Sequence, residues 1–276
     1  MGHVKLAERR VPAGDIQLNV AEVGDGPPLV WLHGAGPGAT GISNFRQNLP
    51  AFEDHRSLVF DLPRFGRSDK PVLSLERGEM FAPFAAAAIA AALEHLGVER
   101  CSVIGNSMGG ATAIKLAADH PHLVDRLVLM AAAGTAPEGW DGGFPPGLLK
   151  IAEWMHAGPS EKLIREFAEL QVYDSSILTD ELLAERLAGA SDPEIVATNP
   201  RTNPLPGDLN PDLPNVQAPT LLLWGREDNF IPLEWGLNAL RRIPDAELRV
   251  IPFCGHWVQF EHTDFFNKVV RDHLEA

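Results

Sequence analysis

The stretch GNSMGG, residues 105–110, decides the fold of this chain. It follows the short apolar segment 101–104, which reads as a buried strand, and it precedes the helix-like segment 111–117. A strand that turns sharply into a helix needs small residues beside the turn, because larger side chains would collide there. The pattern therefore predicts a nucleophile elbow, in which the hydroxyl of Ser107 is exposed at the end of a strand.

A serine hydroxyl is a weak nucleophile at neutral pH, so it needs a base and a group that orients this base. The predicted strand 219–225 leads into a loop with Asp228, and the next predicted strand, 247–251, leads into a loop with His256. Loops beyond the carboxyl ends of parallel strands lie at one edge of the sheet, so distant positions meet there. We predict a catalytic triad of Ser107, His256 and Asp228.

The loop after the predicted strand 28–32 has the sequence HGAGPG, residues 33–38. Its small residues allow the backbone to approach a substrate closely. An N–H group near Ala35 and the N–H group of Met108, directly after the serine, would form an oxyanion hole. We expect His33 to brace this loop rather than to act as the base.

Each of these motifs also has a simpler structural interpretation. A serine between glycines is often only a turn, Asp228 could cap the segment after Gly225, and a single histidine is usually a surface or core residue. The order of the three predicted triad residues on successive strand ends favours the catalytic interpretation.

Composition and charge exclude several classes of partner. The 276 residues include 23 Lys and Arg against 37 Asp and Glu, which gives a formal net charge of −14. This charge argues against nucleic acids and anionic membranes as partners. The longest apolar segment, 81–93, is too short to span a bilayer.

Cysteine use and the first residues indicate the compartment. Cys101 and Cys254 are too few for a disulfide framework, and residues 1–5 do not resemble a secretory signal, so we expect a cytoplasmic protein. The sequence contains no metal-ligand cluster, and the glycine-rich loop 33–38 lacks the lysine of a phosphate-binding loop. We therefore expect neither a metal nor a cofactor.

Strand-like and helix-like segments alternate along most of the chain. This alternation predicts an α/β fold with a mostly parallel, doubly wound sheet and an antiparallel start. The pattern breaks after Gly134, where glycine and proline are frequent, and resumes after Pro214. The predicted organisation has three parts, which are a first core segment, an inserted helical lid and a second core segment: 1–133, 134–214 and 215–276.

The interrupted region has helical signals of its own. Ser160 is a helix cap before the amphipathic segment 161–170, and a second helix is expected after Thr179. A proline-rich return, 199–214, leads back to the sheet. A helical lid would exclude water from a cleft at the catalytic edge, whereas the alternative is a surface excursion without a gating role.

Five motifs together resemble the meta-cleavage product hydrolases, which are carbon–carbon bond hydrolases of the α/β-hydrolase superfamily in aromatic and steroid ring breakdown. They are HGAGPG at 33–38, SNF at 43–45, GNSMGG at 105–110, WGRED at 224–228 and CGHWVQ at 254–259. The resemblance implies an α/β-hydrolase fold and a small-molecule 2-hydroxy-6-oxo-2,4-dienoate substrate. Water would cleave this substrate to a 2-hydroxypentadienoate and a carboxylic acid. One departure is Ala35, where the family commonly has glycine.

The same resemblance implies a set of substrate-binding residues: Gly34, Gly36, Asn44, Asn106, Arg186 and Trp257. A guanidinium and amide donors suit the carboxylate and enolate oxygens at the dienoate end of the substrate. Arg186 could instead be a helical partner of Glu181 or Glu185, and the two asparagines could simply brace loops.

Two other functions use the same core residues. A carboxylesterase needs the triad without a carboxylate clamp, and the fold also serves as a ligand-binding receptor with a retained triad. Epoxide hydrolases and haloalkane dehalogenases carry an aspartate at the elbow, where this chain has Ser107. A homodimer or higher homo-oligomer is expected by analogy alone.

Overall fold

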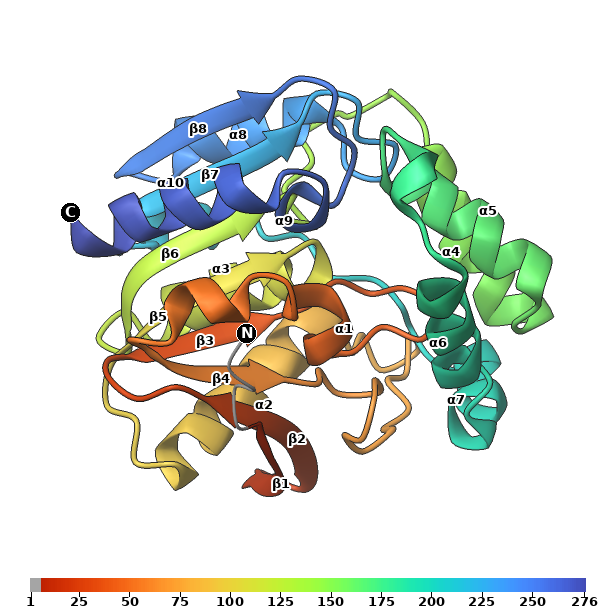
Figure 1. Ribbon diagram of the computed structural model, residues 1–276, viewed down its shortest axis with the longest axis horizontal. Helices are drawn as coiled ribbons and strands as arrows, with labels where there is room; N and C mark the ends of the chain where they lie inside the picture. The colour runs from red at the N-terminus through yellow and green to blue at the C-terminus, as the bar shows by residue number, and fades with distance from the viewer. Residues whose placement is uncertain (1–5) are drawn as a thin grey trace.

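The computed structural model describes residues 6–276 and has one eight-stranded sheet at its centre (Figure 1). The strands are β1 (Ala7–Ala13), β2 (Ile16–Val23), β3 (Pro28–Leu32), β4 (Arg56–Phe60), β5 (Cys101–Asn106), β6 (Val124–Met130), β7 (Thr220–Gly225) and β8 (Ala246–Ile251). Their order in the sheet is β1-β2-β4-β3-β5-β6-β7-β8. The pairs β1–β2 and β2–β4 are antiparallel, and all other pairs are parallel. The predicted α/β class with a mostly parallel sheet is confirmed.

The burial of each strand follows its place in the sheet. All six residues of β7 are buried, as expected for a parallel strand that is covered on both faces. The edge strand β1 exposes its first four residues, 7–10, which include two arginines. Charged side chains on an edge strand oppose pairing with another chain. Residues 1–5, on which the expectation of no secretory signal rests, lie outside the described residues.

Helices cover both faces of the sheet. On one face pack α2 (Phe81–His95), α3 (Met108–Asp119) and α8 (Leu233–Arg242), and on the other pack α1 (Gly41–Phe45), α9 (Val258–Glu261) and α10 (Thr263–Glu275). Each face has its own buried apolar cluster. In the second cluster the Trp31 ring lies 5.1 Å from the Phe45 ring and 5.2 Å from the Phe52 ring. Within residues 6–276, no helix has both the length and the apolar character needed to cross a bilayer.

Four helices lie between β6 and β7 in the sequence: α4 (Pro146–Ala157), α5 (Glu161–Gln171), α6 (Asp180–Ala190) and α7 (Pro193–Thr198). Figure 1 shows them together on one side of the molecule, beyond the arrowheads of β6 and β7. The two predicted helices are confirmed as α5 and α6, and the hydroxyls of Ser160 and Thr179 cap them as expected. Helix α4 was not predicted, because it begins within a segment rich in proline and glycine.

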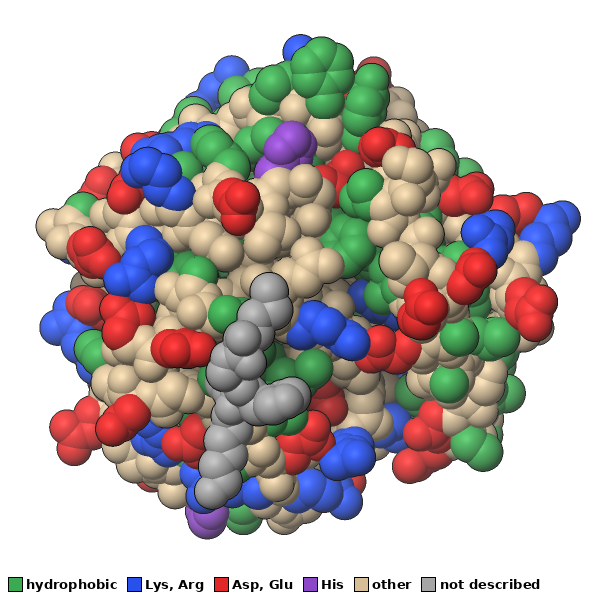
Figure 2. All heavy atoms as spheres, in the orientation of Figure 1, with side chains coloured by type: hydrophobic (Ala, Val, Ile, Leu, Met, Phe, Trp, Pro, Cys, Tyr) green, Lys and Arg blue, Asp and Glu red, His purple; other side chains and the backbone are tan. Residues whose placement is uncertain are grey.

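The surface carries interspersed charges of both signs. On the face in Figure 2, Lys and Arg side chains alternate with Asp and Glu side chains, without a continuous basic area. Several form ion pairs, such as Arg271, whose two terminal nitrogens each lie 2.8 Å from a carboxylate oxygen of Asp54. Exposed pairs of this kind contribute little to stability, about 0 to 1 kcal/mol each. The fold therefore depends on its two apolar clusters.

The turn from β5 to α3 has the strained geometry that the sequence predicts. Ser107 has a φ of 54°, which is rare for a residue other than glycine. A Cβ atom on Gly105 would lie 2.5 Å from the carbonyl oxygen of Gly109, and a Cβ atom on Gly109 would collide with the carbonyl oxygen of Leu32. Only glycine at both positions lets α3 approach β3 and β5 this closely.

His33 joins the loop after β3 to the loop after β4. Its Nε2 accepts a hydrogen bond from the N–H of Leu62 at 3.0 Å, and its Nδ1 lies 2.8 Å from the carbonyl oxygen of Gly34. An accepting Nε2 requires the proton on Nδ1, so the ring is neutral. Complete burial lowers the pKa of His33 to about 4, because burial disfavours the charged imidazolium. The expectation that His33 braces this loop is confirmed.

The order of the strands shows where a ligand should bind. From β3 the chain continues to β4 on one side of it and later to β5 on its other side. In open α/β sheets, ligands bind beyond the carboxyl ends of the strands at such a reversal. The loops that follow β3 and β5 carry Ala35 and Ser107, so the sheet itself places the predicted oxyanion loop beside the predicted nucleophile.

Replacing Gly109 by alanine tests the close approach of α3. Helix propensity alone predicts a gain of about 1 kcal/mol for this change. The collision with the Leu32 carbonyl predicts a loss of about 2 to 4 kcal/mol in the free energy of unfolding, measured by urea denaturation. Gly78→Ala is the control, because Gly78 has a positive φ but open space around it, so strain of about 1 kcal/mol is all that is expected. A more stable Gly109→Ala protein would contradict the account.

Replacing His33 by glutamine tests its buried neutral state. An unfolded histidine has a pKa of about 6.5, whereas folded His33 titrates at about 4. Between these values the unfolded chain binds a proton that the native protein does not, so stability decreases as the pH falls from 6.5 towards 4. The slope from this one proton is at most about 1.4 kcal/mol per pH unit. We expect His33→Gln to remove this contribution to the pH dependence of the free energy of unfolding, measured by urea denaturation at pH 4 to 7. An unchanged slope would argue against a neutral His33 in the native protein.

Candidate active site

The predicted hydrogen bond between the base and the acid of the triad is present. Asp228 Oδ2 lies 2.8 Å from His256 Nδ1, and both side chains are almost completely buried. The other oxygen of Asp228 accepts hydrogen bonds from the N–H groups of Phe230 at 2.7 Å and Ile231 at 3.0 Å. The capping interpretation of Asp228 is confirmed for this oxygen, and the bond of Oδ2 to His256 leaves the catalytic interpretation possible as well. The backbone bonds fix the carboxylate so that it can orient the imidazole.

His256 is held in place by contacts on several sides. The ring of Phe230 stacks on its imidazole with the centroids 4.8 Å apart, and its backbone N–H donates to the carbonyl oxygen of Gln171 at 2.8 Å. Gln171 is the last residue of α5, so the inserted helices help to position the loop of the predicted base. An imidazole fixed at Nδ1 presents Nε2 as the group that could accept a proton from a nucleophile.

The hydrogen bond between Ser107 and His256 that the predicted triad requires is not formed in this structure. Among the described residues, no hydrogen bond joins the Ser107 hydroxyl to His256, and Nε2 of the imidazole has no partner in residues 6–276. Ser107 is held from its backbone instead, with its N–H donating to the carbonyl oxygen of Met130 at 2.8 Å. Catalytic hydrogen bonds are often long before substrate binds and shorten in the complex. The triad assignment therefore remains a prediction that the His–Asp pair and the elbow support.

Two backbone N–H groups are available beside Ser107. The N–H groups of Ala35 and Met108 donate to no acceptor within the described part of the chain, and both residues line the same cavity as Ser107. Met108 is the first residue of α3, so the positive end of the helix dipole lies at the same place. This arrangement can stabilise a negative oxygen that forms beside the serine.

Four of the predicted substrate-binding residues form one buried cluster, which we call the polar cluster: Asn44, Asn106, Arg186 and Trp257. Arg186 Nη2 donates to Asn44 Oδ1 at 3.0 Å, and Asn44 Nδ2 lies 3.5 Å from Asn106 Oδ1. The guanidinium carbon of Arg186 lies 4.9 Å from the centre of the Trp257 ring, a cation–π contact. Residues from α1, β5, α6 and the loop before α9 thus meet in one cluster, and one of them, Asn106, directly precedes Ser107.

Arg186 has no carboxylate partner in the described structure. The alternative in which it pairs with Glu181 or Glu185 is wrong, because no ion pair within residues 6–276 joins it to Glu181 and both carboxylate oxygens of Glu185 accept from Arg46 instead. Arg186 is 4% exposed, and its Nε atom is buried without a hydrogen-bond partner. Burial lowers the pKa of Arg186 to about 10, so the side chain keeps its charge at neutral pH. A buried cation without a counter-ion is costly, which is typical of a site for an anionic ligand.

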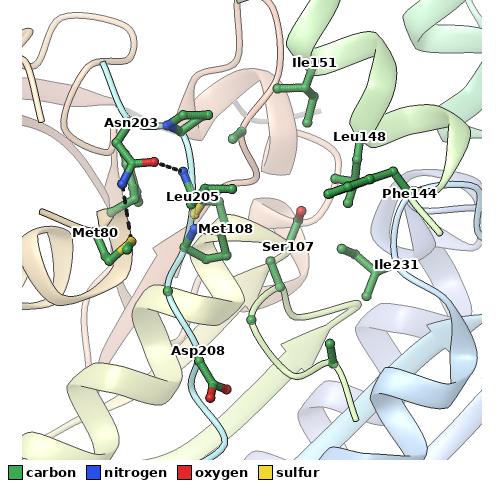
Figure 3. Close-up of a pocket in the computed structure, with 18 of the residues that line it drawn as sticks. Met80, Ser107, Met108, Phe144, Leu148, Ile151, Asn203, Leu205, Asp208 and Ile231 are labelled. Atoms are coloured by element: carbon green, nitrogen blue, oxygen red, sulfur yellow. Dashed lines mark hydrogen bonds between the residues drawn. The ribbon is translucent and has the colours of Figure 1, made fainter. Parts of the chain in front are cut away.

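A cavity of about 960 Å³ reaches Ser107 from the other direction. Figure 3 shows the Ser107 hydroxyl directed into the space between Leu205 on one side and Phe144 and Leu148 on the other. The walls are mostly apolar and come from α4, from the segment 199–211 and from the core. None of the four residues of the polar cluster lines this cavity, so a polar and an apolar region are adjacent to the same serine.

Gly34 and Gly36 have clear structural roles. A Cβ atom on Gly34 would lie 2.8 Å from Asn106 Oδ1 and 3.2 Å from the Ser107 Cβ, and one on Gly36 would lie 2.9 Å from the Phe167 ring. Their neighbours are therefore parts of the protein itself. Substrate contacts of the two glycines remain a prediction.

Two residues of the site were not identified from the sequence. Phe230 stacks on His256, and Arg64 is a buried residue of the cavity wall. Neither has a recognisable motif, because arginines and phenylalanines of loops have no fixed spacing to a catalytic residue. In residues 6–276 no group of three His, Cys, Asp or Glu side chains is arranged to hold a metal ion.

Known proteins share this architecture. A model described as the alpha/beta hydrolase family matches residues 29–269. A 2-hydroxy-6-oxononadienedioate/2-hydroxy-6-oxononatrienedioate hydrolase from a Pseudomonas species is 38% identical, with 95% of this chain and 92% of that protein covered. A 2-hydroxy-6-oxo-6-phenylhexa-2,4-dienoate hydrolase from Burkholderia cepacia is 34% identical, with 94% and 92% covered.

A solved structure gives the same result in three dimensions. The 2-hydroxy-6-oxo-6-phenylhexa-2,4-dienoate hydrolase from Rhodococcus sp. strain RHA1 superimposes with a TM-score of 0.86 at 28% identity, covering 99% of this chain and 100% of that one. The predicted resemblance and the predicted fold are both confirmed. With its elbow serine, its buried His–Asp pair and this similarity over nearly its whole length, the chain belongs to the meta-cleavage product hydrolases, the carbon–carbon bond hydrolases of the α/β-hydrolase family.

Proposed function

We propose that this protein hydrolyses a 2-hydroxy-6-oxo-2,4-dienoate to a 2-hydroxypentadienoate and a carboxylic acid. The observation that carries this proposal is the polar cluster, in which the buried guanidinium of Arg186, without a counter-ion among the described residues, is linked through Asn44 to Asn106, the residue before Ser107. A carboxylate and an enolate oxygen at the end of a dienoate would supply the missing negative charge and accept its N–H groups. A simple ester has no group that requires such a cluster.

The two regions beside Ser107 suit the two halves of the proposed substrate. The dienoate end would occupy the polar cluster, and the group attached to C6 would occupy the apolar cavity. The C6 carbonyl would then lie at Ser107, between the halves. Its oxygen would accept hydrogen bonds from the N–H groups of Ala35 and Met108, which have no acceptor among the described residues.

The proposed reaction begins with ketonisation of the dienol, which makes C5 a stabilised leaving group. His256, oriented by Asp228, removes a proton from Ser107 or from a water molecule, and the resulting oxygen nucleophile adds to C6. The bond between C5 and C6 then breaks, and its electron pair takes up a proton at C5. If water was the nucleophile, C6 leaves directly as the carboxylic acid; if Ser107 was, C6 remains as an ester on the serine, and a water molecule hydrolyses this ester to the acid and free Ser107. One water molecule is consumed in total.

The inserted segment 134–214 acts as a lid in this proposal. Its α6 supplies Arg186, and its α5 ends at Gln171, which holds the backbone of His256. Movement of these helices would therefore change the positions of both Arg186 and His256.

We also propose a cytoplasmic location, which both free cysteines fit. A homodimer or higher oligomer remains a prediction.

Replacing Ser107 by alanine tests the nucleophilic centre. We expect wild-type protein to bleach the yellow colour of a dienoate, and Ser107→Ala to lower kcat by at least about 1,000-fold, because the residue that reacts with or positions the nucleophile at C6 is lost. Ser102→Ala is the matched control, since Ser102 lies on the same strand but away from its carboxyl end. Turnover of p-nitrophenyl esters without any cleavage of dienoates by the wild type would identify an esterase instead. Tight dienoate binding without cleavage would identify a receptor.

Replacing Arg186 by methionine tests whether this residue binds the carboxylate of the dienoate. A hydrogen bond to a charged group contributes about 1.5 to 3 kcal/mol, so kcat/KM for a dienoate should fall by about 10- to 100-fold. The value for p-nitrophenyl butyrate should change by less than about 3-fold, because this ester has no carboxylate to bind. Arg165→Met, on an exposed arginine of α5, is the control for loss of charge in the lid. An equal loss of kcat/KM for the dienoate and for the ester would contradict a role of Arg186 in binding the carboxylate.

A further inference from the structure

Arg64 is a second buried guanidinium at this site, separate from the polar cluster. It follows β4, is 6% exposed and lines the apolar cavity that reaches Ser107. Three other charged residues also line the cavity: Glu138, Asp208 and Arg242. The first two are exposed and the third is half-buried, so Arg64 is the buried charge of this wall within residues 6–276.

The protein leaves this charge without a counter-ion. Arg64 Nη1 donates to the carbonyl oxygen of Pro71 and Nη2 donates to Asn199 Oδ1, both at 2.8 Å, and no described carboxylate pairs with it. The carboxylates in the same loop are engaged elsewhere, because Asp61 accepts from Gly41 N–H, Asn19 and Arg67 N–H, and Asp69 accepts from Gln17 N–H and Arg10. A guanidinium has five N–H donors, and two neutral acceptors do not satisfy them.

The backbone at Arg64 is strained as well. Its φ is 77°, in the left-handed region where glycine is favoured. A residue that keeps a long charged side chain in such a conformation, facing a cavity, is typical of a functional site. Burial also lowers the pKa of Arg64 to about 10, which leaves it charged at neutral pH.

The topology brings the loops of Arg64 and Ser107 to the same edge of the sheet. In the sheet, β4 lies beside β3 and β3 lies beside β5, so the loops with Arg64, Ala35 and Ser107 leave three consecutive strands. Both Arg64 and Ser107 line the same cavity of about 960 Å³, so a group attached to C6 that enters this cavity has Arg64 in its wall.

We propose that Arg64 binds a carboxylate at the far end of the C6 substituent, so that the preferred substrate is a dienoate with a second, distal carboxylate. This inference rests on the proposed function and specifies its substrate class. Similarity alone does not decide between substituents, because relatives named for a dienedioate and for a phenyl-substituted dienoate both resemble the chain at more than 30% identity. The water-dependent cleavage would release a dicarboxylic acid.

Two nine-carbon substrates that differ at one end test the proposal. They are 2-hydroxy-6-oxonona-2,4-dienedioate, which would yield succinate, and 2-hydroxy-6-oxonona-2,4-dienoate, which would yield butyrate. We expect the wild type to have the higher kcat/KM for the dioate. Arg64→Met should lower kcat/KM for the dioate by about 10- to 100-fold and that for the monoacid by less than about 3-fold.

Two further variants separate ligand binding from structure. Arg64→Gly also removes the guanidinium, but glycine adopts a positive φ without strain. This variant should therefore lose the preference for the dioate and have a higher melting temperature than Arg64→Met. Arg67→Met removes an exposed guanidinium from the same loop and should leave both substrates unaffected. In a Ser107→Ala background, titration of the dienoate absorbance should show weaker dioate binding after Arg64→Met and unchanged monoacid binding.

The outcomes distinguish this inference from the proposed function. If the wild type cleaves both substrates and Arg64→Met lowers both rates equally, or neither, Arg64 is structural and the inference fails while the proposed function stands. If the wild type cleaves 2-hydroxy-6-oxo-6-phenylhexa-2,4-dienoate but neither nine-carbon substrate, the inference alone fails. If it cleaves none of the three, the proposed function fails, and the inference that rests on it fails too.

Discussion

The close contact between α3 and the strands β3 and β5 is the constraint on which the rest of the site depends. Gly105 and Gly109 leave no space for a Cβ atom, and Ser107 is held at a φ of 54° between them. This geometry exposes the serine hydroxyl and brings the N–H of Met108, at the positive end of a helix, beside it. The loop after β3 then lies alongside, because His33 fixes it to the loop after β4. The strained turn at Ser107 thus provides the hydroxyl and the N–H group that we predict as nucleophile and as part of an oxyanion hole.

Unbalanced positive charge is the second organising feature of the site. The net charge of the chain is −14, yet Arg186 and Arg64 are buried without a described carboxylate partner. Both keep their charge at neutral pH, and both contact the amide oxygen of an asparagine. One lies in the polar cluster and the other in the wall of the apolar cavity, with Ser107 between them in the arrangement that we propose. A substrate with a carboxylate at each end would match both cations, and its central carbonyl would be placed at the serine.

Much of this architecture could be predicted from the sequence, because its signals are local. Apolar runs define the central strands, hydroxyl caps define α5 and α6, and glycines define the elbow. The predicted meeting of Ser107, Asp228 and His256 uses the rule that loops at the carboxyl ends of parallel strands converge. The remaining features depend on contacts between distant segments. Arg64 is an ordinary loop arginine until folding buries it in the cavity wall. The pairing of Glu185 with Arg46 joins the inserted helix α6 to a residue that follows α1, and it leaves Arg186 without a carboxylate partner among the described residues.

The orientation of the bound substrate is the central claim of this account, and a crystal structure of the Ser107→Ala protein with a dienoate tests it most directly. The account predicts that the dienoate carboxylate lies on Arg186 and Asn44, and that the C6 carbonyl oxygen lies within hydrogen-bonding distance of the N–H groups of Ala35 and Met108. The C6 substituent should extend into the cavity of Figure 3. A substrate bound with its carboxylate in the apolar cavity and no ligand at the polar cluster would contradict the account.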